Sequence, residues 1–188
     1  MASGIQKTAK GLELVMNKKS IYEKYCNDIQ NPVLGASLIA IFCNEFQKQS
    51  IKNEYPQLHL IFVIIPLILN ENFCNQLINS KGNKRTHKTE EGKEVISYLS
   101  KIVNNSKTAN NLHHYTEVFR KYTLTCIAFA KKLNIIEISD DAKIKCITDK
   151  ISRFPNNNRY LKAAKLLGEY FANGMSLSLI QQKLGVTF

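Results

Sequence analysis

The strongest constraint on the fold of this chain is a run of apolar side chains at helical spacing between Lys107 and Leu133. Seven apolar or aromatic residues recur there at steps of three and four, the period of one helix face: Leu112, Tyr115, Phe119, Tyr122, Cys126, Phe129 and Leu133. Lys131 and Lys132 suit the negative end of a helix dipole, and Asn134 can adopt the left-handed cap. The pattern predicts a long helix with one buried face.

Two short β-type runs follow in NIIEISDDAKIKCITD, on either side of Asp140 and Asp141. A long buried helix followed by a hairpin is the skeleton of a winged helix, so we expect a mainly α fold with a small β-hairpin, a winged-helix-like α+β domain. In this fold the long helix is a buried spine. Replacing Phe119 or Phe129 with Ala should then cost about 3–5 kcal/mol.

The same reasoning predicts further helices, at residues 12–26, 32–48, 71–78, 90–103 and 160–171. The segment Pro56–Leu69 fits either a buried strand or a buried helix; we favour a helix kinked at Pro66. The closing residues GMSLSLIQQKLGVTF resemble the first half of a helix-turn-helix, but the chain stops at Phe188 without a second helix. We expect this segment to dock as a short capped helix.

The length of 188 residues suits one compact domain, with a helical part at about 1–80 and a basic winged-helix-like part at about 81–188. The longest apolar run, Leu58–Leu69, is shorter than the roughly 20 residues of a membrane helix. Residues 1–11 have neither the apolar core of a signal peptide nor the arginines of a transit peptide. We expect a cytoplasmic protein without a membrane contact.

The five cysteines are widely spread and form neither a CxxC pair nor a cluster with histidine. This spacing predicts no disulfide framework and no metal site. We expect the cysteines to be small buried hydrophobes in a reducing compartment.

The net charge of +11 lies almost entirely in the second part of the chain. Residues 1–80 hold 7 Lys/Arg and 6 Asp/Glu, whereas residues 81–188 hold 19 and 9. Codon bias toward A and T explains the excess of Lys over Arg but not this asymmetry. A polyanion or an acidic protein face is therefore the partner that we expect.

Two groups of basic residues are candidates for this contact. The segment SKGNKRTHKT at 80–89 is a solvent-facing loop, either a plain connector or a contact made through Lys84, Arg85 and Lys88. The hairpin and the residues after it supply the second group: Lys143, Lys145, Lys150, Arg153, Arg159, Lys162 and Lys165. These seven form either a solvated face or one basic face that straddles a phosphate backbone or meets an acidic surface.

The sequence contains no pattern that predicts catalysis. The phosphate-binding, dinucleotide-binding, zinc-protease and nucleophile-elbow motifs are all missing. His113 and His114 have only Glu117 nearby in helical register, which is not a catalytic constellation. We expect no enzyme activity, no cofactor and no small-molecule substrate.

Four stretches in a fixed order resemble the middle component of bacterial three-component ABC systems, which include the Lamassu-type anti-phage defences. They are NPVLGASLI at 31–39, IIPLIL at 64–69, Lys84-Arg85-Thr86, and KAAKLLGEYFANGMSLSLIQQKLGV at 162–186. The resemblance implies a non-enzymatic adaptor that bridges an SMC- or Rad50-like ATPase and an effector nuclease in a complex that senses foreign DNA. The chain departs from the family pattern in having mainly lysines where an arginine-rich loop is expected, which would make contacts with carboxylates less directional.

Two functional hypotheses follow. In the first, the chain is this adaptor, with the ATPase, the effector and the backbone of double-stranded DNA as partners. In the second, it is a stand-alone winged-helix DNA-binding transcriptional regulator. The second hypothesis requires sequence-selective duplex binding by the isolated protein.

Overall fold

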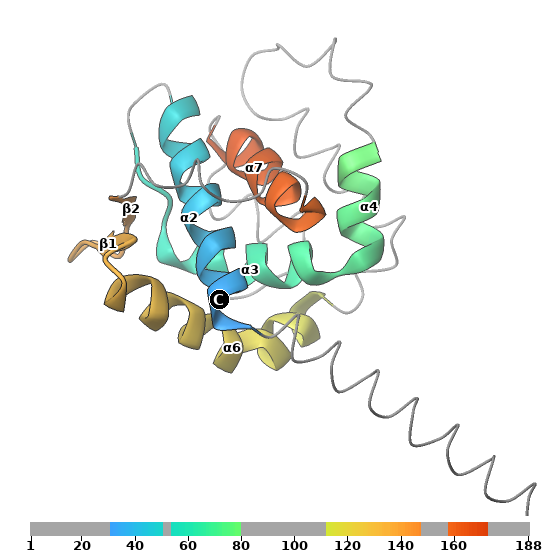
Figure 1. Cartoon of the computed structure of the whole chain (residues 1–188), viewed down its shortest axis with the longest axis horizontal. Coiled ribbons are helices and arrows are strands. Elements are labelled where there is room, and N and C mark those ends of the chain that lie inside the picture. Colours follow the sequence, from blue (N-terminus) through green and yellow to red (C-terminus); the bar gives the residue numbers. More distant parts are fainter. Residues whose placement is uncertain (1–30, 51–53, 80–111, 148–157, 173–188) are drawn as a thin grey trace, which may run out of the picture.

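The computed structural model describes residues 31–50, 54–79, 112–147 and 158–172 (Figure 1). The described elements, in chain order, are α2 Pro32–Gln49, α3 Leu58–Leu69, α4 Glu71–Asn79, α6 Leu112–Lys132, β1 Ile136–Ile138, β2 Ile144–Cys146 and α7 Arg159–Phe171. This confirms a mainly α fold with a small hairpin. The helices predicted at 12–26 and 90–103, the loop at 80–89 and the closing helix lie outside the described residues. The winged-helix interpretation and the division near residue 80 stay predictions.

Helix α2 lies at the centre of the described fold, between α7 and α6 (Figure 1). Asn31 caps its start by accepting a hydrogen bond from the Val33 amide at 2.9 Å, and Pro32 occupies the first position. Ten of its eighteen residues are buried, on every side of the helix. A helix that is buried all round is a core helix, so α2 holds the position that the sequence suggested for the long helix at 107–133.

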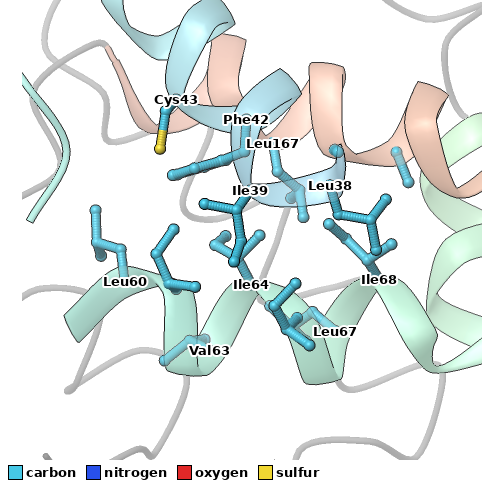
Figure 2. Close-up of a cluster of buried hydrophobic side chains, with 14 of the residues drawn as sticks. Leu38, Ile39, Phe42, Cys43, Leu60, Val63, Ile64, Leu67, Ile68 and Leu167 are labelled. Atoms are coloured by element: carbon cyan, nitrogen blue, oxygen red, sulfur yellow. The ribbon is translucent and has the colours of Figure 1, made fainter. Parts of the chain in front are cut away.

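The hydrophobic core lies where α2 faces α3 and α7. Figure 2 shows Leu38 and Ile39 of α2 reaching toward Ile64 and Ile68 of α3, with Leu167 of α7 beside them. All five side chains are fully buried. Such close packing holds three helices in fixed positions and leaves only the outer surfaces for other molecules.

The segment 56–69 is helical from Leu58, as the sequence favoured. Pro66 lies inside α3, but the sharp change of direction comes later, at Asn70, where α3 and α4 meet at 88°. The Asn70 side chain accepts a hydrogen bond from the Phe73 amide at 3.0 Å and so starts α4.

Helix α6 confirms the predicted long helix, and its buried face overlaps the predicted one only in part: Leu112 and Cys126 of the predicted face are fully buried. Thr116, Thr123, Ile127 and Ala130 are buried, whereas Phe119 and Phe129 are only partly buried. Leu133 is 51% exposed. Small side chains point inward because α6 packs closely on α2 and α3, and the bulky aromatic rings lie at the edge of that contact. The prediction of a buried spine therefore holds only in part, because Phe119 and Phe129 pack against the core from partly buried positions and do not lie inside it.

The end of α6 follows the predicted left-handed cap. Asn134 has φ 53°, and its amide donates to the Lys131 carbonyl at 3.0 Å. The Ile135 amide donates to the Ala130 carbonyl at 2.9 Å, which completes a Schellman motif. This cap turns the chain directly into β1.

The strands β1 and β2 are antiparallel, with Glu137 opposite Lys145. The Ile136 and Ile144 side chains are buried against the helices, while Glu137 and Lys145 point to solvent. Residues 56–58 lie along the other edge of β2: the Ile144 amide donates to the Pro56 carbonyl at 2.9 Å. The sheet itself has two strands, β1 and β2, and Gln57 adds an isolated antiparallel bridge to Lys143.

No single described helix is both long and apolar enough to span a membrane. The bent pair α3 and α4 reaches the required length together, but nine of the twelve residues of α3 are buried in the core.

Candidate functional site

Five of the ten predicted contact residues lie in the described part of the chain, on the hairpin and on α7. They are Lys143, Lys145, Arg159, Lys162 and Lys165. The other five, Lys84, Arg85, Lys88, Lys150 and Arg153, lie outside the described residues.

At the hairpin tip, Lys143 is held by an acidic neighbour. Its Nζ lies 2.7 Å from Oδ2 of Asp141. The Ser139 hydroxyl donates a hydrogen bond to the same carboxylate. The bonds from Lys143 and Ser139 lower the pKa of Asp141 below its ordinary value of 3.8, and the Asp141 carboxylate raises the pKa of Lys143.

Arg159 ties the start of α7 to α4. Its Nη1 donates to Oε1 of Glu71 at 2.8 Å, and its Nη2 donates to the Tyr160 hydroxyl at 2.9 Å. The guanidinium also lies 4.8 Å from the centre of the Tyr160 ring. These bonds to Tyr160 and Glu71 raise the pKa of Arg159. Arg159 thus joins two helices and has little freedom to meet another molecule.

The two lysines of α7 differ in their surroundings. Lys165 lies 3.9 Å from Oε2 of Glu45, a carboxylate on α2 whose side chain is only 10% exposed. Lys162 is exposed and has no ion pair within the described residues. Among the five described candidates, Lys145 and Lys162 are thus the two without a salt bridge to another described side chain.

A shallow pocket of about 270 Å³ lies on the solvent side of the hairpin. Its lining combines the aromatic ring of Tyr55 with Glu137, Ser139, Lys143 and Lys145. Charges of both signs face this space, so it suits a zwitterionic or mixed-charge surface better than a phosphate backbone. The sequence analysis missed Tyr55, because only the pairing of residues 56–58 with β2 brings it beside the hairpin.

The buried thiols are inert. Burial raises the pKa of Cys74 and of Cys126 to about 11, and it also raises the pKa of Cys43. A thiol with a raised pKa is a poor nucleophile. These three cysteines are buried and free, as the sequence predicted, whereas Cys146 on β2 is only partly buried, which differs from the prediction. Cys26 lies outside the described residues.

Within the described ranges, no group of three or more His, Cys, Asp or Glu side chains is placed to hold a metal ion. His114 is exposed and lies near the ring of Tyr115, with 6.3 Å between the centroids.

The described residues are nearly neutral. They carry ten Lys/Arg and eight Asp/Glu, which is +2 of the total +11. The acids that pair with Arg159 and Lys165 come from other helices, at Glu71 and Glu45. No sequence window could reveal these pairings, because the partners are separated by 88 and 120 positions.

Comparison with known proteins assigns most of the chain to one family. Residues 19–188 match the family described as ABC-three component (ABC-3C) system Middle Component 3. No curated protein and no solved structure matches the chain.

Proposed function

Because the chain belongs to the family of ABC-three component system middle component 3, we propose that it is the non-enzymatic adaptor of a three-part complex. In this complex it bridges an SMC- or Rad50-like ABC ATPase and an effector nuclease. The complex senses DNA and defends its host against phages or plasmids. The family match over residues 19–188 is the observation that carries the proposal.

The described fold supports an adaptor through its rigid core and its varied surfaces. Three helices pack around Phe42 and Ile39, both fully buried, so the outer side chains are held at fixed relative positions. The hairpin extends from the C-terminal end of α6 at one side of the molecule (Figure 1). A rigid body with separate surfaces is what a bridge between two proteins requires.

The predicted basic residues contribute to this role unequally. Lys145 and Lys162 are the members available for a partner within the described ranges, because Lys143, Arg159 and Lys165 already pair with carboxylates. We therefore assign the contact with an acidic surface, or with the backbone of double-stranded DNA, to Lys145 and Lys162. The set is completed by the members outside the described ranges: Lys84, Arg85, Lys88, Lys150 and Arg153.

Co-expression with the neighbouring ATPase and effector genes tests the proposal. Affinity purification through a tag on this chain should recover all three proteins, and recovery of this chain alone would contradict the proposal. Bridging makes a stronger prediction: without this chain, a tagged ATPase should no longer recover the effector. If ATPase and effector purify together equally well in its absence, the chain is not the bridge.

The second candidate, a winged-helix regulator that binds DNA alone, is favoured by one observation. Gln57 forms an isolated β-bridge with Lys143 beside β2, and the hairpin follows directly after the long helix α6. The charges of the hairpin oppose it, since Glu137, Asp140 and Asp141 lie where a wing would approach phosphates. Fluorescence anisotropy of labelled DNA duplexes, titrated with the isolated protein, tests this candidate function. A regulator should bind tightly and with an affinity that depends on the DNA sequence.

A further inference from the structure

The outer face of α6 carries apolar side chains that the described part of the fold leaves exposed to solvent. We define this face by Val118, Lys121, Leu124, Ala128, Lys131 and Lys132, which are all exposed. Val118 is 57% exposed and Leu124 51% exposed. The opposite face of α6, with Thr123 and Ala130, makes the contacts with α2 and α3. Helix α6 lies at the lower margin of the described part of the molecule in Figure 1.

Exposed apolar side chains are concentrated at this helix. Six large hydrophobic side chains are exposed within the described residues, and three of them, Val118, Leu124 and Leu133, belong to α6 or its C-terminal turn. Single exposed hydrophobic residues are ordinary, but a group on one element with no internal role indicates a contact surface. The residues that define the outer face span about four helical turns, a length of roughly 20 Å.

Positive charge surrounds these apolar side chains. Glu117 is the one acid on α6, and its Oε1 lies 3.7 Å from Nη1 of Arg120. Lys121, Lys131 and Lys132 have no ion pair within the described residues, which leaves a charge of +3 around Leu124 and Ala128. Lys121 is three residues from both Val118 and Leu124 and so lies between them on the helix. A face that mixes apolar and cationic side chains in this way is complementary to one that mixes apolar and acidic side chains.

We propose that the outer face of α6 docks an acidic amphipathic helix of another subunit of the complex. Apolar residues of that helix cover Val118 and Leu124, and its carboxylates meet Lys121, Lys131 and Lys132. A helix fits because side chains along α6 form ridges and grooves into which a second helix packs. The inference rests on the proposed function, because it takes the partner to be the ATPase or the effector.

Two other occupants fit less well. A second copy of this chain packing α6 against α6 would place +3 opposite +3, which is unfavourable. A DNA duplex would neutralise the lysines but would gain little from Val118 and Leu124, and it would meet the hairpin carboxylates of Asp140 and Asp141 at the end of the helix.

Two double variants test the apolar and the charged part separately. The variant Val118→Gln/Leu124→Gln removes the large apolar side chains of the outer face and keeps helix-compatible residues. The variant Lys121→Glu/Lys132→Glu reverses two of the positive charges of the same face.

Two single variants are matched controls. Ile147→Gln changes an apolar residue with 49% exposure that follows β2 and is not part of the outer face, and Lys48→Glu reverses an exposed lysine on α2. Circular dichroism of each protein verifies that the fold is kept.

Binding of each full-length variant to the purified ATPase and to the purified effector is measured by titration calorimetry. Both double variants should raise the Kd for one of these proteins by roughly tenfold or more, while the controls stay within about twofold. The defect of Lys121→Glu/Lys132→Glu should shrink as salt rises. In the wild-type complex, carbodiimide should cross-link Lys121, Lys131 or Lys132 to a partner carboxylate, a readout that needs no variant.

The outcomes separate this inference from the proposed function. If the complex forms but both double variants bind like the wild type, or if no cross-link involves α6, the docking face is refuted and the adaptor role stands. If the charge variant weakens binding to a DNA duplex while the apolar variant changes nothing, the outer face meets nucleic acid and the inference is wrong. If the wild type binds neither protein, the proposed function fails and this inference fails with it.

Discussion

The crossing of α2 and α6 leaves no room for a side chain at Gly35. A Cβ added there would lie 2.1 Å from Sγ of Cys126, 2.9 Å from Cβ of Cys126 and 2.9 Å from Oη of Tyr122. Cys126 is fully buried, so the sulfur cannot move into solvent. Gly35→Ala should therefore force α2 and α6 apart. Adding Cys126→Ala to this variant should remove the sulfur atom and so make much of the room that the new methyl group needs.

The magnitude follows from two opposing terms. Overpacking a tight core site costs about 3 kcal/mol, at the upper end of the usual range, because the sulfur contact is so short. Replacing Gly with Ala inside a helix stabilises the helix by about 1 kcal/mol, because Ala has the higher helix propensity. The net effect of Gly35→Ala should therefore be to lower the free energy of unfolding by about 2 kcal/mol. Cys126→Ala removes one buried atom and should cost about 1 kcal/mol. In the double variant the new Cβ at position 35 still lies 2.9 Å from the Cβ at position 126 and 2.9 Å from Oη of Tyr122, so about 1 kcal/mol of the overpacking remains. The double variant should therefore cost about 1 kcal/mol in total, whereas additive effects would give about 3 kcal/mol.

Urea denaturation followed by circular dichroism measures the four proteins of this cycle. Gly168→Ala is the matched control, since a Cβ there would lie 2.6 Å from the Phe42 carbonyl oxygen, a backbone atom far from Cys126. Cys126→Ala should give no rescue of Gly168→Ala. If Gly35→Ala and Cys126→Ala were additive within about 0.5 kcal/mol, the close crossing of α2 and α6 would be refuted.

Three further predictions concern the core and the hairpin. Phe42→Ala should cost about 3–5 kcal/mol because Phe42 is fully buried, while Phe119→Ala should cost roughly half as much at its partly buried position; equal losses in urea denaturation would contradict this difference. The pKa of Asp141 is lowered by Lys143, so this carboxylate contributes stability above pH 3.8 that is lost as the pH falls through its lower folded-state pKa; NMR titration should show the pKa rising toward 3.8 in Lys143→Gln, and no change would exclude the ion pair. Ala142 has φ 56°, so Ala142→Gly should raise the free energy of unfolding by about 0.5–1 kcal/mol, and a loss in urea denaturation would contradict that backbone conformation.

The sequence predicted which segments are helical better than it predicted which side of a helix is buried. The helical period of α6 and its cap at Asn134 depend on residues that are close in sequence, so the local sequence pattern predicts both. The direction of the buried face depends on how closely other helices approach. Cys126 of the predicted face meets α2 at Gly35, whereas Thr123 and Ala130 are also buried, and such small or polar residues do not stand out in a hydrophobic pattern.

The ten predicted contact residues illustrate a second limit. Composition and spacing show that positive charge accumulates in the second part of the chain. They do not show which cations are already neutralised, because Arg159 and Lys165 pair with Glu71 and Glu45 from distant parts of the sequence. Surface electrostatics depend on tertiary contacts, so this part of the candidate site required the structure.

The uneven distribution of charge assigns different tasks to different parts of the chain. The described residues carry only +2 of the net +11, so most of the long-range attraction for a polyanion or an acidic protein comes from the remaining +9. Salt should weaken that attraction strongly, because it is largely electrostatic. The proposed partner contacts of the exposed Val118 and Leu124 on α6 are apolar and should persist at high salt. Partner binding should therefore fall with salt to a plateau rather than to zero, and the plateau should be lost in Val118→Gln/Leu124→Gln.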